Sequence, residues 1–313
     1  MENLIFGTDD YYGIGPVDYQ KIKDGGATFV IHKASSGLRP DPMFEPNCEA
    51  ADKVGLINGA YHWDDPLVND YQQAEFFLGR VRGKVAFVMN DMEQWWADWY
   101  KWYKMIRREI PASAVPRLSS ARIIQSAQRT SEIISQGGLP FLGYSAAWFV
   151  ASYARDLGKV VLSKYRTCLA SYPFGSGRLK ITWADMVLIL ADHKNKKPIY
   201  PIGVSNHTLW QISGDKFILP GNDSPADVNL FNGGQDAWAD FLSGKPQAFV
   251  PYVAKTTAWV GLIVRAGPAQ SFERLGLLPY GTVVTIEKEQ TGWGYVTTEK
   301  ASGWISLSWV KRV

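Results

Sequence analysis

The stretch Val85-Ala86-Phe87-Val88-Met89-Asn90-Asp91-Met92-Glu93 joins an apolar run to two carboxylates. Its apolar part predicts a strand buried on both faces, because no polar residue interrupts it before Asn90. If the extended geometry continues to Glu93, Asp91 and Glu93 point to one face, since side chains alternate along a strand. The stretch therefore predicts two acids at the tip of one buried strand.

A pair of neighbouring carboxylates suits glycoside hydrolysis, in which one acid holds a proton near neutral pH and the other stays charged. A plainer interpretation is that Asp91 and Glu93 are solvated turn residues. They could also be acids in the first turn of a helix that starts near Gln94, where the helix dipole favours negative charge. This stretch alone leaves these alternatives open.

The composition is that of a soluble globular protein, with 313 residues, 46% hydrophobic and 20% charged. This length allows one large domain and a small one. A formal net charge of +3 is too small to predict nucleic-acid binding, although it is compatible with an anionic polymer such as a cell wall. The 13 Trp residues exceed what a core of this size requires, and exposed aromatic faces occur in sugar-binding clefts.

The sequence contains no stretch that is apolar for long enough to cross a bilayer. Its N-terminus lacks the basic start and the long apolar region of a signal peptide, so we expect synthesis in the cytosol and no membrane insertion. Cys48 and Cys168 lie far apart in unrelated contexts, which predicts free buried thiols.

Motifs for metal or nucleotide binding are missing from the sequence. The four histidines, at positions 32, 62, 193 and 207, show no metal-ligand spacing, and no glycine-rich phosphate loop follows the first predicted strand. The serine motif Gly-x-Ser-x-Gly is also absent. We therefore expect no metal, cofactor or nucleotide, and carboxylates remain the main catalytic candidates.

Strands and helices are predicted to alternate along most of the chain. The predicted strands cover residues 4–9, 27–37, 56–63, 85–93, 139–144, 165–172, 208–212 and a late segment near Asp227, and the predicted helices lie before Gly25 and at 41–54, 72–78, 119–135 and 183–191. This order predicts a parallel sheet covered by helices, and its closure into a barrel would bring the strand tips to one rim. Asp9, at the end of the first strand, and Asp227 would add two acids there.

Two further patterns carry alternatives. Trp95, Trp99 and Trp102 fall on one stripe of a predicted helix, which favours core packing over sugar stacking. The basic run at 193–198 predicts a solvated loop rather than a phosphate site.

The alternating pattern ends near Ser243-Gly244-Lys245-Pro246. Short predicted strands at 260–265, 282–288, 294–298 and 303–306 are separated by turn signals, as is typical of a small β-barrel. We therefore predict a first domain at 1–243, a linker at 244–254 and a second domain at 255–313.

The first domain resembles the glycoside hydrolase family 25 lysozymes, many of which are phage endolysins. The resemblance runs from about residue 4 to residue 243 and follows the order of the family's motifs. The matching segments are Gly7-Thr8-Asp9, Phe29-Val30-Ile31-His32-Lys33-Ala34, Gly59-Ala60-Tyr61-His62-Trp63, Asp91-Met92-Glu93, Gly143-Tyr144-Ser145, Leu169-Ala170-Ser171-Tyr172, Leu209-Trp210-Gln211-Ile212-Ser213 and Asp227-Val228-Asn229-Leu230-Phe231-Asn232-Gly233.

The second domain looks like a bacterial SH3 domain, a module that commonly binds peptidoglycan in endolysins. The segments that carry this resemblance are Val264-Arg265-Ala266-Gly267-Pro268, Leu278-Pro279-Tyr280-Gly281-Thr282 and Gly303-Trp304-Ile305.

The resemblance implies an irregular, TIM-like β/α barrel that cleaves the bond between N-acetylmuramic acid and N-acetylglucosamine, followed by a small all-β SH3-like barrel. It makes Glu93 the general acid, with Asp91, Asp9 and Asp227 as its acidic companions. Burial near other carboxylates should raise the pKa of Glu93. The residues implied to line the substrate groove are Tyr61, Tyr144, Trp210 and Lys33. The alternatives are that the three aromatic residues pack at the top of the barrel and that Lys33 forms a structural ion pair. One departure is Ser36, where many relatives carry Glu.

The implied protein is a monomeric, cofactor-free endolysin whose partner is bacterial peptidoglycan. It would be made in the host cytoplasm and act on the cell wall outside it, although a bacterial protein exported by another route would have the same sequence features. One alternative is a non-catalytic wall-binding or glycan-binding protein on the same barrel. Another is a hydrolase of a different glycosidic bond.

Overall fold

The protein is described here by a computed structural model that covers residues 4–244, 251–290, 292–298 and 301–313. The chain divides into two compact units, Met1–Lys245 and Pro246–Val313. The predicted linker at 244–254 lies partly outside the described residues. Its last residues already belong to strand β12 (Tyr252–Thr256) of the second unit.

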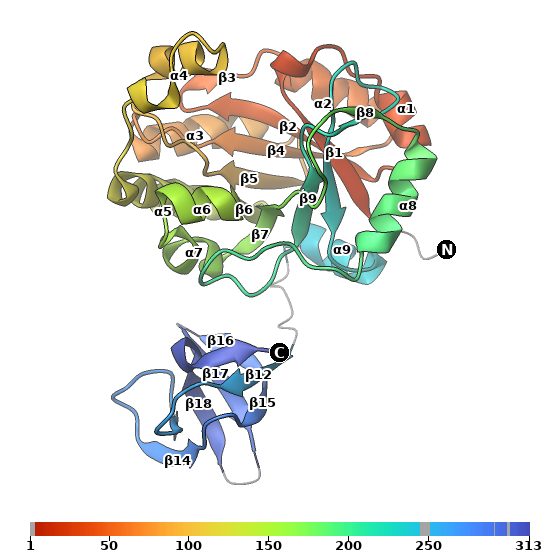
Figure 1. The fold of residues 1–313 in the computed structure, drawn as a ribbon. Coiled ribbons are helices and arrows are strands. Elements are labelled where there is room, and N and C mark those ends of the chain that lie inside the picture. The colour runs from red at the N-terminus through yellow and green to blue at the C-terminus, as the bar shows by residue number, and fades with distance from the viewer. Residues whose placement is uncertain (1–3, 245–250, 291, 299–300) are drawn as a thin grey trace. The chain divides into compact units, whose positions relative to one another are not determined.

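A closed sheet forms the centre of the first unit (Figure 1). Within the described residues, eight strands pair in the circular order β1, β2, β4, β5, β6, β7, β9, β11 and back to β1. Their bounds are β1 (Phe6–Asp10), β2 (Phe29–Ser36), β4 (Ile57–Trp63), β5 (Phe87–Asp91), β6 (Phe141–Ala146), β7 (Arg166–Ala170), β9 (Leu209–Ser213) and β11 (Asp227–Phe231). The structure thus has the predicted barrel of mixed α/β class.

One strand of the barrel runs against the others, which corrects the expectation of an all-parallel sheet. Strand β11 is antiparallel to both of its neighbours, β1 and β9. Its first residue, Asp227, is therefore at the rim where the other strands end, and it pairs directly with Asp9 of β1.

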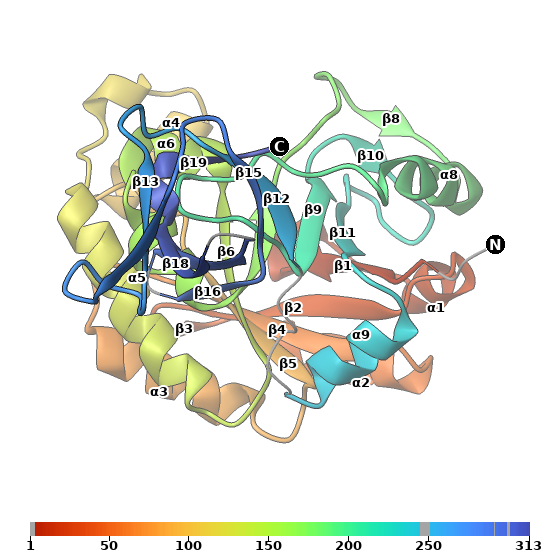
Figure 2. The ribbon, with the colours of Figure 1, turned by 90° about the horizontal axis from the view of Figure 1, so that it is seen from below.

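Helices surround the outside of the closed sheet (Figures 1 and 2). They are α1 (Tyr19–Asp24), α2 (Phe44–Lys53), α3 (Asp70–Val81), α5 (Ser120–Ser135), α6 (Ala147–Tyr153), α7 (Leu157–Val160) and α8 (Trp183–His193). Local capping fixes several starts: the Ser119 side chain accepts a hydrogen bond from the backbone of Arg122 at the start of α5. Asn69 caps α3 in the same way, so that helix begins before the predicted residue 72.

The predicted tryptophan stripe is wrong for its first member. Helix α4 (Trp99–Ile106) begins after its cap Asp98, so it contains Trp99 and Trp102 but not Trp95. The chain is extended before this cap, where Trp96 forms an isolated β-bridge with Arg117.

Helix α9 (Gln235–Leu242) closes the end of the barrel opposite the acids. Its Trp238 stacks on Phe29, the first residue of β2, with ring centroids 5.0 Å apart. It also contacts Phe87, the first residue of β5, and Phe231, the last residue of the reversed β11. Gly59 leaves room for this packing, because a Cβ atom there would lie 2.4 Å from the Phe87 ring.

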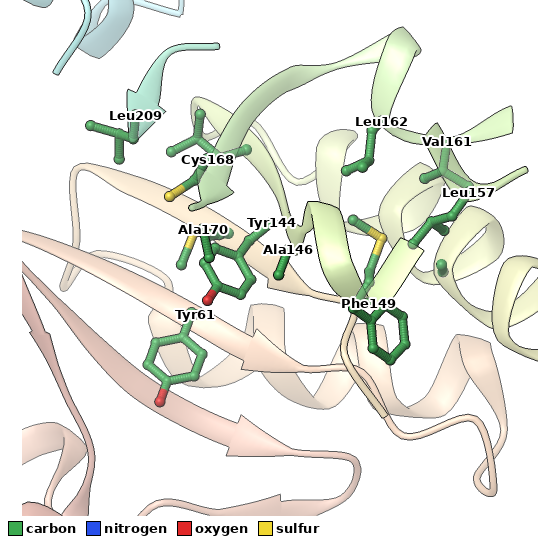
Figure 3. Packing of buried hydrophobic residues seen from close by; sticks show 14 of the residues in the cluster. Tyr61, Tyr144, Ala146, Phe149, Leu157, Val161, Leu162, Cys168, Ala170 and Leu209 are labelled. Carbon is green, nitrogen blue, oxygen red and sulfur yellow. The ribbon is translucent and has the colours of Figure 1, made fainter. Parts of the chain in front are cut away.

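The apolar core continues between the sheet and its helical cover. Figure 3 shows Phe149, Leu157, Val161 and Leu162 packed beside strands β6 and β7. Cys168 instead faces the barrel interior, where its Sγ donates to Asn229 Oδ1 at 3.6 Å. Both cysteines are buried and free, as predicted. No helix in the described residues is both long and apolar enough to span a membrane.

Short elements complete the first unit. They are the strands β3 (Arg39–Pro40), β8 (Leu179–Lys180) and β10 (Phe217–Ile218), and the 3-10 helices at Tyr12–Ile14, Ala112–Ala114 and Leu162–Lys164. Strand β3 forms a hairpin with the end of β2 and so places Arg39 at the rim of the barrel. The basic run forms the last residue of α8 and the turn after it, as predicted.

The second unit is all-β, as predicted. Its remaining elements are β13 (Leu262–Arg265), β14 (Arg274–Leu278), β15 (Val283–Ile286), β16 (Lys288–Gln290), β17 (Trp293–Thr297), β18 (Ser302–Ser306), a 3-10 helix at Leu307–Trp309 and β19 (Val310–Arg312). The strands form two small sheets around Val264, Ile286, Val296 and Ile305. Strands β12, β14, β16 and β19 were not predicted.

The packing of Trp238 generates a test of the barrel floor. We expect Trp238→Ala to lower the unfolding free energy of the first unit by about 3–5 kcal/mol, because it opens a large cavity among aromatic rings. The matched control is Trp148→Ala in α6, whose side chain is 57% exposed and which should change stability by about 0.5 kcal/mol or less. Urea titration followed by circular dichroism compares the two. Equal shifts would contradict the assigned role of Trp238.

Candidate active site

The four predicted acids line one groove at the rim of the barrel. Asp9 is the penultimate residue of β1, Asp91 ends β5 with Glu93 two residues beyond it, and Asp227 begins β11. All four line a cavity of about 760 Å³. Three segments far apart in sequence therefore meet, because the closed sheet brings their ends together. Within the described residues, no group of three or more His, Cys, Asp or Glu side chains is arranged to hold a metal.

Asp9 is held rigidly by amide donors. Its Oδ2 accepts hydrogen bonds from Gln211 Nε2 at 2.9 Å and from Asn229 Nδ2 at 2.8 Å. Burial raises the pKa of Asp9 to about 6, although these donors oppose the shift. The pKa of Asp227 is also raised, by burial first, then by the charge of Asp9 and a hydrogen bond with it. We therefore expect Asp227 to retain a proton and Asp9 to carry the charge near neutral pH.

Glu93 has the properties of a proton donor at this pH. It lies two residues beyond the end of β5 and is only partly buried, so its carboxyl can reach a ligand in the groove. Desolvation raises the pKa of Glu93 to about 7, and the charge of Asp9 adds to the increase. A hydrogen bond from the backbone of Ala146 opposes this shift.

Asp91 is buried beside Glu93. Burial raises the pKa of Asp91 well above its usual value, the charge of Glu93 raises it further, and the charge of Lys33 opposes both effects. Two neighbouring desolvated negative charges repel each other, so we expect Asp91 and Glu93 together to hold at least one proton near neutral pH. Within the described residues, Asp91 Oδ1 has no hydrogen-bond partner.

The alternative role of these acids as solvated or helix-capping residues does not fit the structure. Asp91 is the last residue of β5 and only 5% exposed, so it is not a solvated turn residue. The nearest following helix, α4, begins at Trp99 with no acid in its first turn.

Lys33 lines the groove inside a cage of aromatic rings. Its Nζ lies 4.8 Å from the centroid of the Trp63 ring and 5.7 Å from the centroids of Tyr11 and Tyr61. Burial lowers the pKa of Lys33, and the charge of Asp91 opposes that shift. Lys33 therefore places a positive charge near Asp91 in the groove.

Tyr61 and Tyr144 also line the groove, as their predicted role requires. Both rings are largely buried and come from strands on either side of β5 (Figure 3). The Tyr144 hydroxyl donates to Gln211 Oε1 at 2.8 Å, so it fixes the neighbour of Asp9.

The structure corrects the predicted position of Trp210. This side chain is 3% exposed and lies in the core cluster beneath α8, where its indole Nε1 donates to the Ser171 carbonyl at 2.7 Å. Side chains alternate along β9, so the neighbouring Gln211 faces the groove instead.

Gln211 and Tyr172 are site residues that the sequence prediction missed. Tyr172 Oη donates to Gln211 Oε1 at 2.6 Å, which leaves the amide nitrogen of Gln211 directed at Asp9. The alternation of side chains in the Leu209–Ser213 segment would have indicated Gln211 once Trp210 was assigned to the outer face.

Another buried acid, Asp10, lies directly behind the site. Asp10 accepts hydrogen bonds at 2.9 Å from the Tyr19 hydroxyl and from the ring of His32. Burial is the largest single effect on His32 and lowers its pKa. The charge of Asp10 and its hydrogen bond oppose burial, and the net shift in the pKa of His32 is upward. Asp10 therefore points away from the groove and is bonded to His32 of β2.

The arrangement suits acid-assisted cleavage of a glycosidic bond. It combines a protonated carboxyl that can reach the ligand, a second carboxyl beside it and a fixed negative charge across the groove. The aromatic groove walls fit a saccharide, which has apolar faces.

Comparisons with known proteins agree with this chemistry. The profile of Glycosyl hydrolases family 25 matches residues 9–218, and that of the bacterial SH3 domain matches residues 260–311. An N,O-diacetylmuramidase from Arthroderma benhamiae is 25% identical over 242 residues, which are 75% of this chain and 86% of that protein.

Two solved structures show the same barrel. A bacterial lysozyme from Streptomyces coelicolor superposes with a TM-score of 0.57 at 19% identity, covering 77% of this chain and 98% of the lysozyme. The catalytic domain of the endolysin ply40, from a Listeria monocytogenes bacteriophage, gives a TM-score of 0.52 at 18% identity over 77% and 98% of the two chains. With the profile matching more than half of its length, the chain belongs to glycosyl hydrolases family 25 and is a glycoside hydrolase of the lysozyme type that carries a bacterial SH3 domain.

Proposed function

We propose that the protein is an N-acetylmuramidase that cleaves the β-1,4 bond between N-acetylmuramic acid and N-acetylglucosamine in bacterial peptidoglycan. The observation that carries this proposal is the convergence of Asp9, Asp91, Glu93 and Asp227 in one groove. The muramidase from Arthroderma benhamiae, similar over most of both chains, supports the same substrate class.

In this proposal Glu93 donates its proton to the glycosidic oxygen as the bond breaks. The charged Asp9 stabilises the positive charge that develops on the sugar ring, since its geometry is fixed before the substrate binds. Asp91 accepts a hydrogen bond from the substrate or from the attacking water through its unpartnered oxygen. Gln211 acts as a positioning residue for Asp9.

The SH3 unit has a separate role in the proposed function. Binding of this unit to the wall would raise the local concentration of the barrel at its substrate. All four acids come from one chain, so a monomer suffices for the reaction.

We also propose that the protein is a phage endolysin, made in the host cytoplasm and acting on the cell wall outside it. The similarity of its barrel to that of a bacteriophage endolysin supports this origin. A bacterial enzyme of the same fold would have the same site, so origin and chemistry are separate proposals.

Analysis of the digestion products tests the bond that is cleaved. After digestion of purified cell walls and reduction with borohydride, we expect the reduced sugar to be N-acetylmuramic acid. Reduced N-acetylglucosamine would instead identify a glucosaminidase. If the protein binds the walls but no new reducing end appears, the result would favour the alternative of a non-catalytic wall-binding protein.

Substitution of the proposed acid tests its role. We expect Glu93→Gln to lower the rate of wall lysis by about 10²–10⁴-fold, because the amide of Gln is too weak an acid to transfer a proton to the leaving group. Glu49→Gln, on the exposed face of α2, is the matched control and should retain the parent rate. Turbidity of wall suspensions gives the rate, and equal lysis by the parent and Glu93→Gln would contradict the assignment.

The pH dependence of kcat/KM tests the assigned charges. Activity should fall as the pH rises past about 7, where Glu93 loses its proton, and should fall below about 6, where Asp9 gains one. In Asp9→Asn the alkaline limb of the residual activity should move to a lower pH, because the substitution removes a charge that raises the pKa of Glu93. Asp24→Asn, exposed on α1, should leave both limbs unchanged. An alkaline limb that stays in place in Asp9→Asn would contradict the coupling.

A further inference from the structure

The segment around helix α4 forms a wall of aromatic side chains along the groove. This aromatic wall consists of Trp96, Trp99, Trp102 and Tyr103, with the aliphatic Ile106 beside them, and all five side chains line the groove. No residue of α4 is buried, and from this helix Trp102 and Met105 are the hydrophobic side chains packed against the main core cluster. The core therefore does not account for the exposed rings of the wall, which mark an interaction surface.

The rings of the wall are ordered by stacking on one another. Trp96 stacks on Trp102 with centroids 4.2 Å apart and planes at 16°. Trp99 and Tyr103, one helical turn apart, stack at 5.3 Å with planes at 6°. A ligand would therefore meet rings that already have fixed orientations, which lowers the entropy cost of binding.

Basic side chains accompany the aromatic wall. The guanidinium of Arg39, in β3, lies 5.7 Å from the centroid of Trp99, and Arg107 Nη1 donates to the Tyr103 hydroxyl at 3.1 Å. Both Arg side chains remain more than half exposed, at 58% and 59%, although Arg107 pairs with Glu109 at 2.9 Å and Arg39 lies 3.9 Å from Asp65. Lys101 and Lys104 lie on the same helix. One side of the groove is therefore aromatic, with Arg39 in its lining and further basic side chains on the adjoining helix, whereas the groove floor carries the four acids.

This separation of charge indicates how a ligand would lie. Carboxylates on the ligand are repelled by the acids of the floor and attracted to the basic side chains of the wall. In peptidoglycan, the muramic acid units carry peptides with free carboxylates, and the sugar rings present apolar C–H faces. Both features match the wall, since guanidinium groups pair with carboxylates and aromatic rings cover apolar faces.

We propose that the aromatic wall is a binding subsite for the peptidoglycan strand on one side of the scissile bond. Sugar rings pack against Trp99 and its neighbours, and stem-peptide carboxylates bind Arg39 and Arg107. This inference rests on the proposed function, because it places the glycan strand in the catalytic groove.

A helix with aromatic and basic residues also fits an anionic membrane surface. The groove favours the glycan, because the residues of the wall line the same cavity as the catalytic acids. Adsorption to anionic vesicles is therefore kept as a separate arm of the test.

The test measures binding by the full-length Glu93→Gln protein, which does not consume its ligand. The probes are a soluble peptidoglycan hexasaccharide with its stem peptides, and the same hexasaccharide after an amidase has removed them. We expect Trp99→Ala/Tyr103→Ala to raise the Kd of both probes about tenfold in isothermal titration calorimetry. We expect Arg39→Gln/Arg107→Gln to raise the Kd of the stem-bearing probe alone.

Two control variants match these changes. Trp148→Ala/Tyr71→Ala removes aromatic rings that are 57% and 62% exposed, and Arg82→Gln removes an exposed charge. Within the described residues, Trp148, Tyr71 and Arg82 do not line the groove. The SH3 domain is present in every protein, so a difference between variants belongs to the aromatic wall. The controls should bind both probes as the Glu93→Gln background does.

An activity assay separates this proposal from the proposed function. With Glu93 restored, Trp99→Ala/Tyr103→Ala should raise KM on long strands and leave kcat unchanged. Unchanged Kd values in both groove variants would overturn the subsite. The subsite would also be overturned if the groove variants lost binding to phosphatidylglycerol vesicles but still bound the hexasaccharide like the background protein. The parent protein could fail to cleave walls while the groove variants still show the expected changes in Kd. That result would contradict the muramidase and support the subsite.

Discussion

The pairing of Asp9 with Asp227 across two antiparallel strands is the constraint on which the site depends. A carboxylate at the end of one strand lies beside another at the start of the next, which is possible because β11 runs against its neighbours. The pair shares a hydrogen bond, and buried amide donors from Gln211 and Asn229 hold the charged partner. A parallel β11 would have placed Asp227 at the opposite end of the barrel, among the aromatic residues that pack on α9.

The cost of collecting several acids is what makes the site reactive. Each buried carboxyl is less stable in its charged form than it would be in water, and each neighbouring charge adds to this penalty. The result is a group of acids that ionise in sequence, with the pKa of Asp9 at about 6 and that of Glu93 at about 7. The charge of Lys33, in its aromatic cage, reduces this penalty at Asp91.

The aromatic residues of the chain divide between two tasks. Phe29, Phe87 and Trp238 seal the closed end of the barrel, where no water or ligand is needed. Trp99 and Tyr103 line the open end, where they stay exposed. Composition alone cannot distinguish these uses, since both require large apolar surfaces. The distinction comes from which end of the barrel each segment reaches.

The sequence by itself determined the alternation of strands and helices, the second all-β domain and the four acids of the groove. These features follow from local patterns, because the period of apolar residues and the position of turn residues depend only on near neighbours. Tertiary structure alone decided the reversal of β11, the exchange of Trp210 for Gln211 at the groove and the exclusion of Trp95 from α4. Strand direction and the facing of a side chain depend on pairing between residues far apart in the chain, which local patterns do not contain.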